Sequence, residues 1–75
     1  MLYTAVFFRE DGNRMEHRQC FKASSIKQAK AFSLVYAYDK RAYGVVLYSL
    51  DAPETAYGRP RAFFSFSSGE WKSYA

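Results

Sequence analysis

One segment of helical spacing, flanked on both sides by strand-like alternation, limits this chain to a single helix and several strands. Ser25 is followed three residues later by Gln28, which is the spacing of a capping box. In that motif the serine hydroxyl accepts the amide proton of the third helical residue, and the glutamine reaches back to the amide of the cap. The pattern predicts a helix that begins after Ser25 and ends near Tyr38. Its expected inner stripe consists of Ile26, Ala29, Phe32, Ser33 and Tyr36.

Strand-like segments precede and follow this helix. The pair Asp11-Gly12 separates the first two and favours a tight hairpin, because glycine accepts a positive φ. Residues 51–61 contain two prolines and a glycine and predict a loop. The expected strands are residues 2–9, 15–22, 42–50, 62–67 and 70–74.

These elements predict an α+β fold in which one helix packs on one face of an antiparallel sheet of four to five strands. The element order is β-β-α-β-β-β. A chain of 75 residues has room for one core, so residues 1–75 are expected to form a single small α+β domain. The composition is 49% hydrophobic and 20% aromatic, which is typical of a folded chain and not of a disordered one.

A single helix covers only one face of a sheet, yet the strand at residues 42–50 is apolar on both sides. The sheet face opposite the helix, called the far face below, is therefore expected to expose aromatic side chains. The alternative is that the long loop or a second copy of the chain covers it, which would make the protein a homodimer. We expect Val6, Phe8, Val45, Leu47, Phe64 and Phe66 under the helix, and Tyr3, Phe7, Tyr48 and Phe63 on the far face.

The sequence offers no constellation for catalysis, for a cofactor or for a metal. His17 and Cys20 are three residues apart on an expected strand, so their side chains should point to opposite faces. No further cysteine or histidine exists to complete a metal site. The glycines are scattered singly, which excludes a glycine-rich phosphate loop. We therefore expect a binding protein and not an enzyme.

Two further features bear on location. No apolar run approaches the roughly 18 residues that a membrane span requires, so no membrane partner is expected. The chain begins with Met1 and lacks a basic segment of the kind that opens a secretory signal. A cytoplasmic protein is the expectation.

The charge pattern favours an acidic partner. The net charge is +4, and basic residues recur on one expected strand, on the outer side of the helix and around Pro60. Ordinary surface charge is the alternative, and acidic residues among the bases support it. The candidate partner-binding residues are Arg14, Arg18, Lys22, Lys27, Lys30, Tyr48, Arg59 and Arg61.

The layout also carries a resemblance. A hairpin, the helix start Ser25-Ile26-Lys27-Gln28-Ala29-Lys30, a central strand and a closing hairpin with Trp71 resemble the small phage-encoded anti-CRISPR proteins that inhibit type I systems. The resemblance implies an inhibitor in the host cell cytoplasm that docks on a type I CRISPR surveillance complex and blocks target DNA binding. It also implies that lysines and arginines contact the complex or the DNA. The alternatives are a small basic nucleic-acid-binding module and a homodimeric interaction domain.

Overall fold

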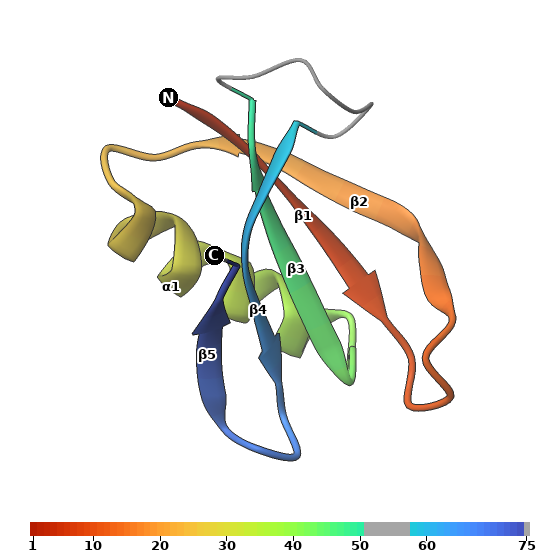
Figure 1. The fold of residues 1–75 in the computed structure, drawn as a ribbon. Helices are drawn as coiled ribbons and strands as arrows, with labels where there is room; N and C mark the ends of the chain where they lie inside the picture. The colour runs from red at the N-terminus through yellow and green to blue at the C-terminus, as the bar shows by residue number, and fades with distance from the viewer. Residues whose placement is uncertain (51–57, 75) are drawn as a thin grey trace.

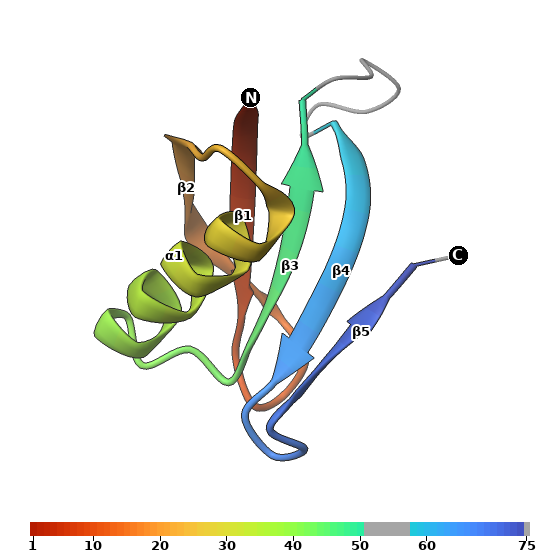
Figure 2. The same cartoon turned by 90° about the vertical axis from the view of Figure 1, so that its left-hand side faces the viewer.

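The computed structural model describes residues 1–50 and 58–74, and within them it contains one helix on an antiparallel sheet (Figure 1). The strand order in the sheet is β2-β1-β3-β4-β5. The helix lies on one face of the sheet (Figure 2). The predicted fold class and element order are confirmed. The elements are β1 (Leu2–Phe8), β2 (Arg14–Lys22), α1 (Ile26–Asp39), β3 (Gly44–Ser49), β4 (Arg59–Ser65) and β5 (Glu70–Ser73).

The register of β1 decides which side chains lie under the helix. Ala5 pairs with Leu47 and Phe7 with Val45, and paired side chains stand on the same face. Phe7 and Val45 belong to one buried cluster with Ala37 of α1, so the odd-numbered residues of β1 face the helix. Tyr3 and Phe7 are 5% and 0% exposed.

The predicted faces are therefore wrong for β1. Val6 and Phe8 lie on the far face, whereas Tyr3 and Phe7 lie under α1. Both parities of this strand are apolar, so alternation alone could not choose between them. The placement of Val45, Leu47 and Phe64 under the helix, and of Tyr48 and Phe63 on the far face, agrees with the register.

Small side chains of α1 form its closest contact with the sheet. Ala29, Ser33 and Ala37 recur every fourth residue, and each is 0% exposed. The Ser33 hydroxyl donates to the Ala29 carbonyl at 2.8 Å, so this buried polar group is satisfied. The larger Phe32 lies at the border of the contact, 39% exposed, with its ring 6.0 Å from that of Phe21. The predicted inner stripe is therefore right at Ala29 and Ser33 and wrong in treating Phe32 as covered.

The helix begins at a serine cap, as predicted. The Gln28 amide donates to the Ser25 hydroxyl at 3.1 Å. The Gln28 side-chain oxygen accepts from the amide of Ser24 at 2.7 Å, one residue earlier than the capping-box pattern predicts. Two otherwise unsatisfied donors near the helix N-terminus are thereby bonded.

A left-handed residue ends the helix. Arg41 has a φ of 56°, a conformation that favours glycine. The Ala42 amide donates to the Ala37 carbonyl at 2.9 Å and the Arg41 amide donates to the Tyr38 carbonyl at 3.1 Å. These bonds form a Schellman motif with arginine at the position where glycine is most common.

Strand β4 begins at Arg59 and not at Ala62, so the predicted loop is too long at its C-terminal end. Tyr48 pairs with Pro60 and Leu47 pairs with Ala62, which leaves Arg61 as an extra residue in a β-bulge. A bulge interrupts the ladder, which is one of the few places where a strand tolerates proline. Residues 51–57 of the predicted loop lie outside the described residues.

Candidate functional site

The far face carries a group of apolar and aromatic side chains from β1, β3 and β4, together with Tyr74, which follows β5. Val6 pairs with Val46, Val46 with Phe63, and Phe63 with Lys72, so these residues stand together on the face opposite α1. The Phe63 and Tyr74 ring centroids are 5.6 Å apart. Half-buried or exposed members of the group, which leave part of each side chain accessible, are Leu2, Phe8, Val46, Tyr48, Phe63 and Tyr74.

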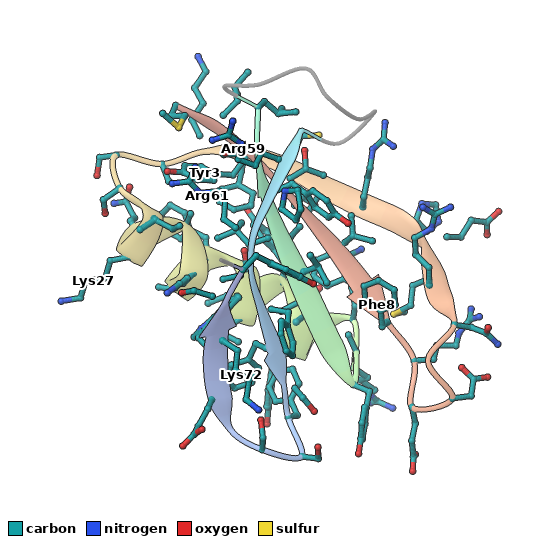
Figure 3. All side chains as sticks on the ribbon, in the orientation of Figure 1. Tyr3, Phe8, Lys27, Arg59, Arg61 and Lys72 are labelled. Atoms are coloured by element: carbon teal, nitrogen blue, oxygen red, sulfur yellow. The ribbon has the colours of Figure 1, made fainter. Side chains whose placement is uncertain are left out.

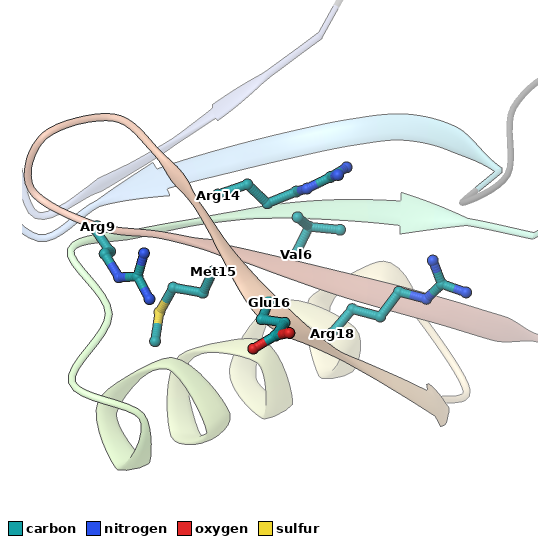
Figure 4. A pocket seen from close by; sticks show the side chains of 6 residues that line it. All are labelled: Val6, Arg9, Arg14, Met15, Glu16 and Arg18. Carbon is teal, nitrogen blue, oxygen red and sulfur yellow. The ribbon is translucent and has the colours of Figure 1, made fainter.

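A row of bases borders this group on strand β2. Arg14 pairs with Phe8, Arg18 with Val6 and Lys22 with Leu2, and all three bases are exposed. The predicted common strand face of these bases is confirmed by the register. Val6 is only 2% exposed and lies between Arg14 and Arg18 (Figure 4). The far face is thus covered at Val6, and its accessible area lies at the half-buried side chains of β3 and β4 and at the exposed bases of β2.

A bulge in β2 separates two of these bases. Arg18 pairs with Val6, and Arg14 pairs with Phe8. Residues 15–17 of β2 therefore lie opposite one β1 residue, where a regular ladder would have one residue on each strand. The bulge opens a hollow of about 500 Å³. In Figure 4 the side chains of Arg9 and Arg14 point apart, so they do not converge on one anion. The lining residues are Val6, Arg9, Arg14, Met15, Glu16 and Arg18.

The other predicted bases lie elsewhere. Arg59 pairs with Ser49, and Ser49 also pairs with the buried Tyr3. Arg59 therefore lies on the α1 side of the sheet. Arg59 and Arg61 share a hollow with Ile26 at the start of α1. The Lys30 ammonium lies 5.7 Å from the Trp71 ring centroid, and Lys27 points away from the molecule (Figure 3).

The eight predicted residues therefore fall into two groups, which adjoin at the hollow that Tyr74 of the far face lines together with Arg59 and Arg61. Arg14, Arg18, Lys22 and Tyr48 lie on the far face, and Lys27, Lys30, Arg59 and Arg61 lie around α1. Each of the four arginines takes part in a further interaction within the chain.

The sequence analysis did not predict two residues of the far face, Lys72 and Tyr74. Lys72 is exposed and stands opposite Phe63, and Tyr74 follows it after one residue with its ring against Phe63. The tight turn at Ser68-Gly69 was the available signal, since a short hairpin fixes which residues of its strands are paired. Counting outward from that turn would have placed Lys72 on the same face as Phe63.

His17 and Cys20 both lie on strand β2. Cys20 is exposed, and its sulfur lies 3.4 Å from the Thr4 hydroxyl oxygen. His17 is exposed within the bulged part of β2. In residues 1–50 and 58–74 no three His, Cys, Asp or Glu side chains are grouped so that they could hold a metal ion.

The single described helix is too short to cross a membrane. No protein-family model, curated protein or solved structure matches the chain. The fold and the surface together define an α+β protein whose sheet presents aromatic and basic side chains on the face away from its helix.

Proposed function

We propose that this is a non-catalytic binding protein that docks on a negatively charged macromolecular partner through the far face of its sheet. The observation that carries the proposal is that the row of Arg14, Arg18 and Lys22 on β2 shares one face of the sheet with the half-buried rings of Tyr48 on β3 and Phe63 on β4. Aromatic side chains supply contact area at low entropic cost, and bases around them select an acidic surface.

The partner we propose is a type I CRISPR surveillance complex, and the protein is then a phage-encoded inhibitor that blocks target DNA binding in the host cytoplasm. The layout resemblance supports this partner, and so does the net charge of +4, because such complexes are rich in nucleic acid. Inhibition by docking needs no cleft and no reactive group. It needs only a surface large enough to keep DNA from its site.

Charge reversal on the far face tests this function. Lys22 and Lys72 are exposed on opposite edges of that face, so Lys22→Glu/Lys72→Glu should reduce affinity for a purified type I complex by more than tenfold. The single variants Lys22→Glu and Lys72→Glu are each compared with Lys27→Glu, which reverses one charge on α1 and should leave the affinity within about twofold of the wild type. A wild-type protein that leaves DNA binding by the complex unchanged would rule out this partner. Unchanged affinity of the double variant would rule out this face.

A second candidate function is the binding of single-stranded nucleic acid. The neighbouring rings of Phe63 and Tyr74, which are tilted by 53° to each other, lie beside Lys72, and base stacking with phosphate neutralisation uses aromatic and basic side chains of this kind. Fluorescence anisotropy with a labelled single-stranded oligonucleotide tests it. Binding that weakens steeply with salt supports this candidate, and the absence of binding at low salt excludes it.

A further inference from the structure

Strand β2 forms the longer edge of the sheet in the part of the chain that the structure describes (Figure 1). It has nine residues, whereas β5 at the other edge has four. Natural sheets commonly protect an edge by keeping it short or by interrupting it with a bulge. The first protection applies to β5, and the second applies to residues 15–17 of β2. Residues 18–22, called the regular edge below, pair with β1 without interruption.

The hydrogen-bond pattern shows which backbone groups of the regular edge point away from β1. The Ala23 amide donates to the Met1 carbonyl at 3.1 Å, and the Met1 amine donates to the Ala23 carbonyl at 3.3 Å. Hydrogen-bonded and non-hydrogen-bonded pairs alternate along an antiparallel ladder, so the even-numbered residues of the regular edge form no ladder bonds to β1. The amides and carbonyls that point outward are therefore those of Arg18, Cys20 and Lys22. The Gln19 side-chain amide donates to the Cys20 carbonyl at 3.3 Å, in agreement with this direction.

The two sides of the regular edge differ in chemistry. On the far face Arg18 and Lys22 are exposed. On the α1 side the Phe21 ring lies 6.0 Å from the Phe32 ring and 5.6 Å from the Tyr36 ring, and Phe32 is 39% exposed. A strand placed beside β2 would lie about 4.8 Å away, with its side chains alternating between these two sides. Every second residue of that strand would meet bases, and the residues between them would meet partly exposed rings.

We propose that the regular edge of β2 binds an extended segment of a protein partner in which acidic and apolar residues alternate. The outward backbone groups of β2 supply hydrogen bonds, and the side chains on its two sides supply selectivity. Carboxylates on the far-face side reach Arg18 and Lys22, while apolar side chains cover Phe21 and Phe32. The segment belongs to the acidic partner of the proposed function, so the inference rests on that function and deepens it.

The acids of residues 1–50 and 58–74 lie outside the regular edge. Glu10 and Asp11 lie in the turn before β2, and Glu16 lies in the bulge. Glu70 lies on β5 at the other edge, and Asp39 is the last residue of α1. The regular edge itself contains two bases and no acid, so an acidic segment meets favourable charge along it.

Charge also favours such a segment over a second copy of this chain. A two-fold dimer paired through the whole regular edge has its axis at Cys20, which sets Arg18 against Lys22 of the second copy. Like charges directly opposite each other are destabilising. Shifted registers enter the bulge or pass the end of β2, so they keep fewer regular pairs.

Amide hydrogen exchange with a synthetic peptide tests the edge. The probe is a short peptide of alternating glutamate and valine at neutral pH, and the control peptide has lysine in place of glutamate. The amides of Cys20 and Lys22 should exchange severalfold more slowly with the glutamate peptide and at an unchanged rate with the lysine peptide. No slowing at about 1 mM glutamate peptide overturns the proposal. Slowing that appears without peptide as the protein concentration rises indicates a second copy and overturns it too.

A proline at position 20 tests the backbone bonds. It removes an outward amide and leaves the ladder with β1 in place. Cys20→Pro should weaken binding of the glutamate peptide at least tenfold, whereas Cys20→Ala, which keeps the amide, should bind within about twofold of the wild type. Equal affinities of these two variants overturn strand addition.

A charge reversal keeps the test valid if the thermal midpoint shows that Cys20→Pro does not fold. Lys22→Glu changes an exposed side chain of the regular edge, and Lys72→Glu makes the same change on β5. Only Lys22→Glu should weaken binding of the glutamate peptide severalfold. Equal effects of the two reversals overturn the assignment to β2.

The surveillance complex separates this inference from the proposed function. Loss of affinity in Cys20→Pro but not in Cys20→Ala supports strand addition to the partner. Loss of affinity in Lys72→Glu with full affinity in Cys20→Pro overturns strand addition and leaves docking through the far face standing.

Discussion

The backbone of Gly58 lies directly against the carbonyl group of Ser49. A Cβ atom added to Gly58 would stand 2.8 Å from the Ser49 carbonyl carbon and closer still to its oxygen. Gly58 also has a φ of 99°, which side chains rarely adopt. This contact joins the last residue of β3 to the residue before β4. The two strands, which carry Tyr48 and Phe63, are paired with each other from this point onward.

Gly58→Ala should therefore be among the most damaging single substitutions in the chain. The steric clash and the backbone strain together should cost about 3 kcal/mol or more. Gly12→Ala is the matched control, because Gly12 also has a positive φ but nothing lies within 4 Å of the added atom. It should cost about 1 kcal/mol, from strain alone. Urea denaturation measures both, and equal losses would contradict the packing at Gly58.

The serine cap of α1 gives a second prediction. Ser25→Ala removes the acceptor of the Gln28 amide proton and should lower the free energy of unfolding by about 1 kcal/mol. Ser24→Ala is the control, since it removes the exposed bond from the Ser24 hydroxyl to the Gln28 side chain but leaves the Ser24 backbone amide bonded there and the cap at Ser25 intact. Equilibrium denaturation should show the larger loss for Ser25. An unchanged midpoint for Ser25→Ala would mean that the hydroxyl does not support the helix.

The left-handed backbone of Arg41 gives a third prediction. Arg41→Gly removes the steric cost of a φ of 56° and should stabilise the protein by about 0.5 to 1 kcal/mol. Arg41→Ala removes the same charge but keeps a Cβ, so it should not stabilise. The comparison of the two thermal midpoints isolates the backbone effect. A destabilising glycine would indicate that the arginine side chain itself holds the helix end.

The exposed thiol gives a fourth. Cys20→Ser keeps a hydrogen-bonding group 3.4 Å from the Thr4 hydroxyl position and should change stability by no more than about 0.5 kcal/mol. Treatment with a chelator should leave folding unchanged. Elemental analysis of the purified protein supplies the check. A stoichiometric metal content would overturn the interpretation of His17 and Cys20 as residues without a metal.

Local signals were enough to predict the elements and their order. Asp11-Gly12 marked the first hairpin, and Ser25 with Gln28 marked the helix start, because each depends on bonds between residues close in sequence. The inter-strand register depends on contacts between residues far apart. In β1 the odd-numbered and the even-numbered residues are both apolar. The alternation of polar and apolar residues therefore does not indicate whether Phe7 or Phe8 faces the helix.

The candidate site was predicted only in part for the same reason. Arg14, Arg18 and Lys22 share one strand, so their common face followed from parity. The loop prediction for residues 51–61 included Arg59 because the segment holds two prolines and a glycine, and the bulge that admits Pro60 to the strand is not evident from composition. Lys72 lies on the far face because of its pairing in the hairpin of β4 and β5, and the turn at Ser68-Gly69 makes that pairing predictable from the sequence.

The central claim is that the far face is the docking surface, and hydroxyl-radical footprinting of the bound protein tests it most directly. A type I surveillance complex and a single-stranded oligonucleotide are the two partners to use, with the protein dilute enough to be monomeric. The account predicts that Tyr48, Phe63 and Tyr74 lose reactivity on binding, whereas Tyr38 on the outer side of α1 keeps its reactivity. Protection of Tyr38 with unchanged reactivity of the three far-face rings would contradict it.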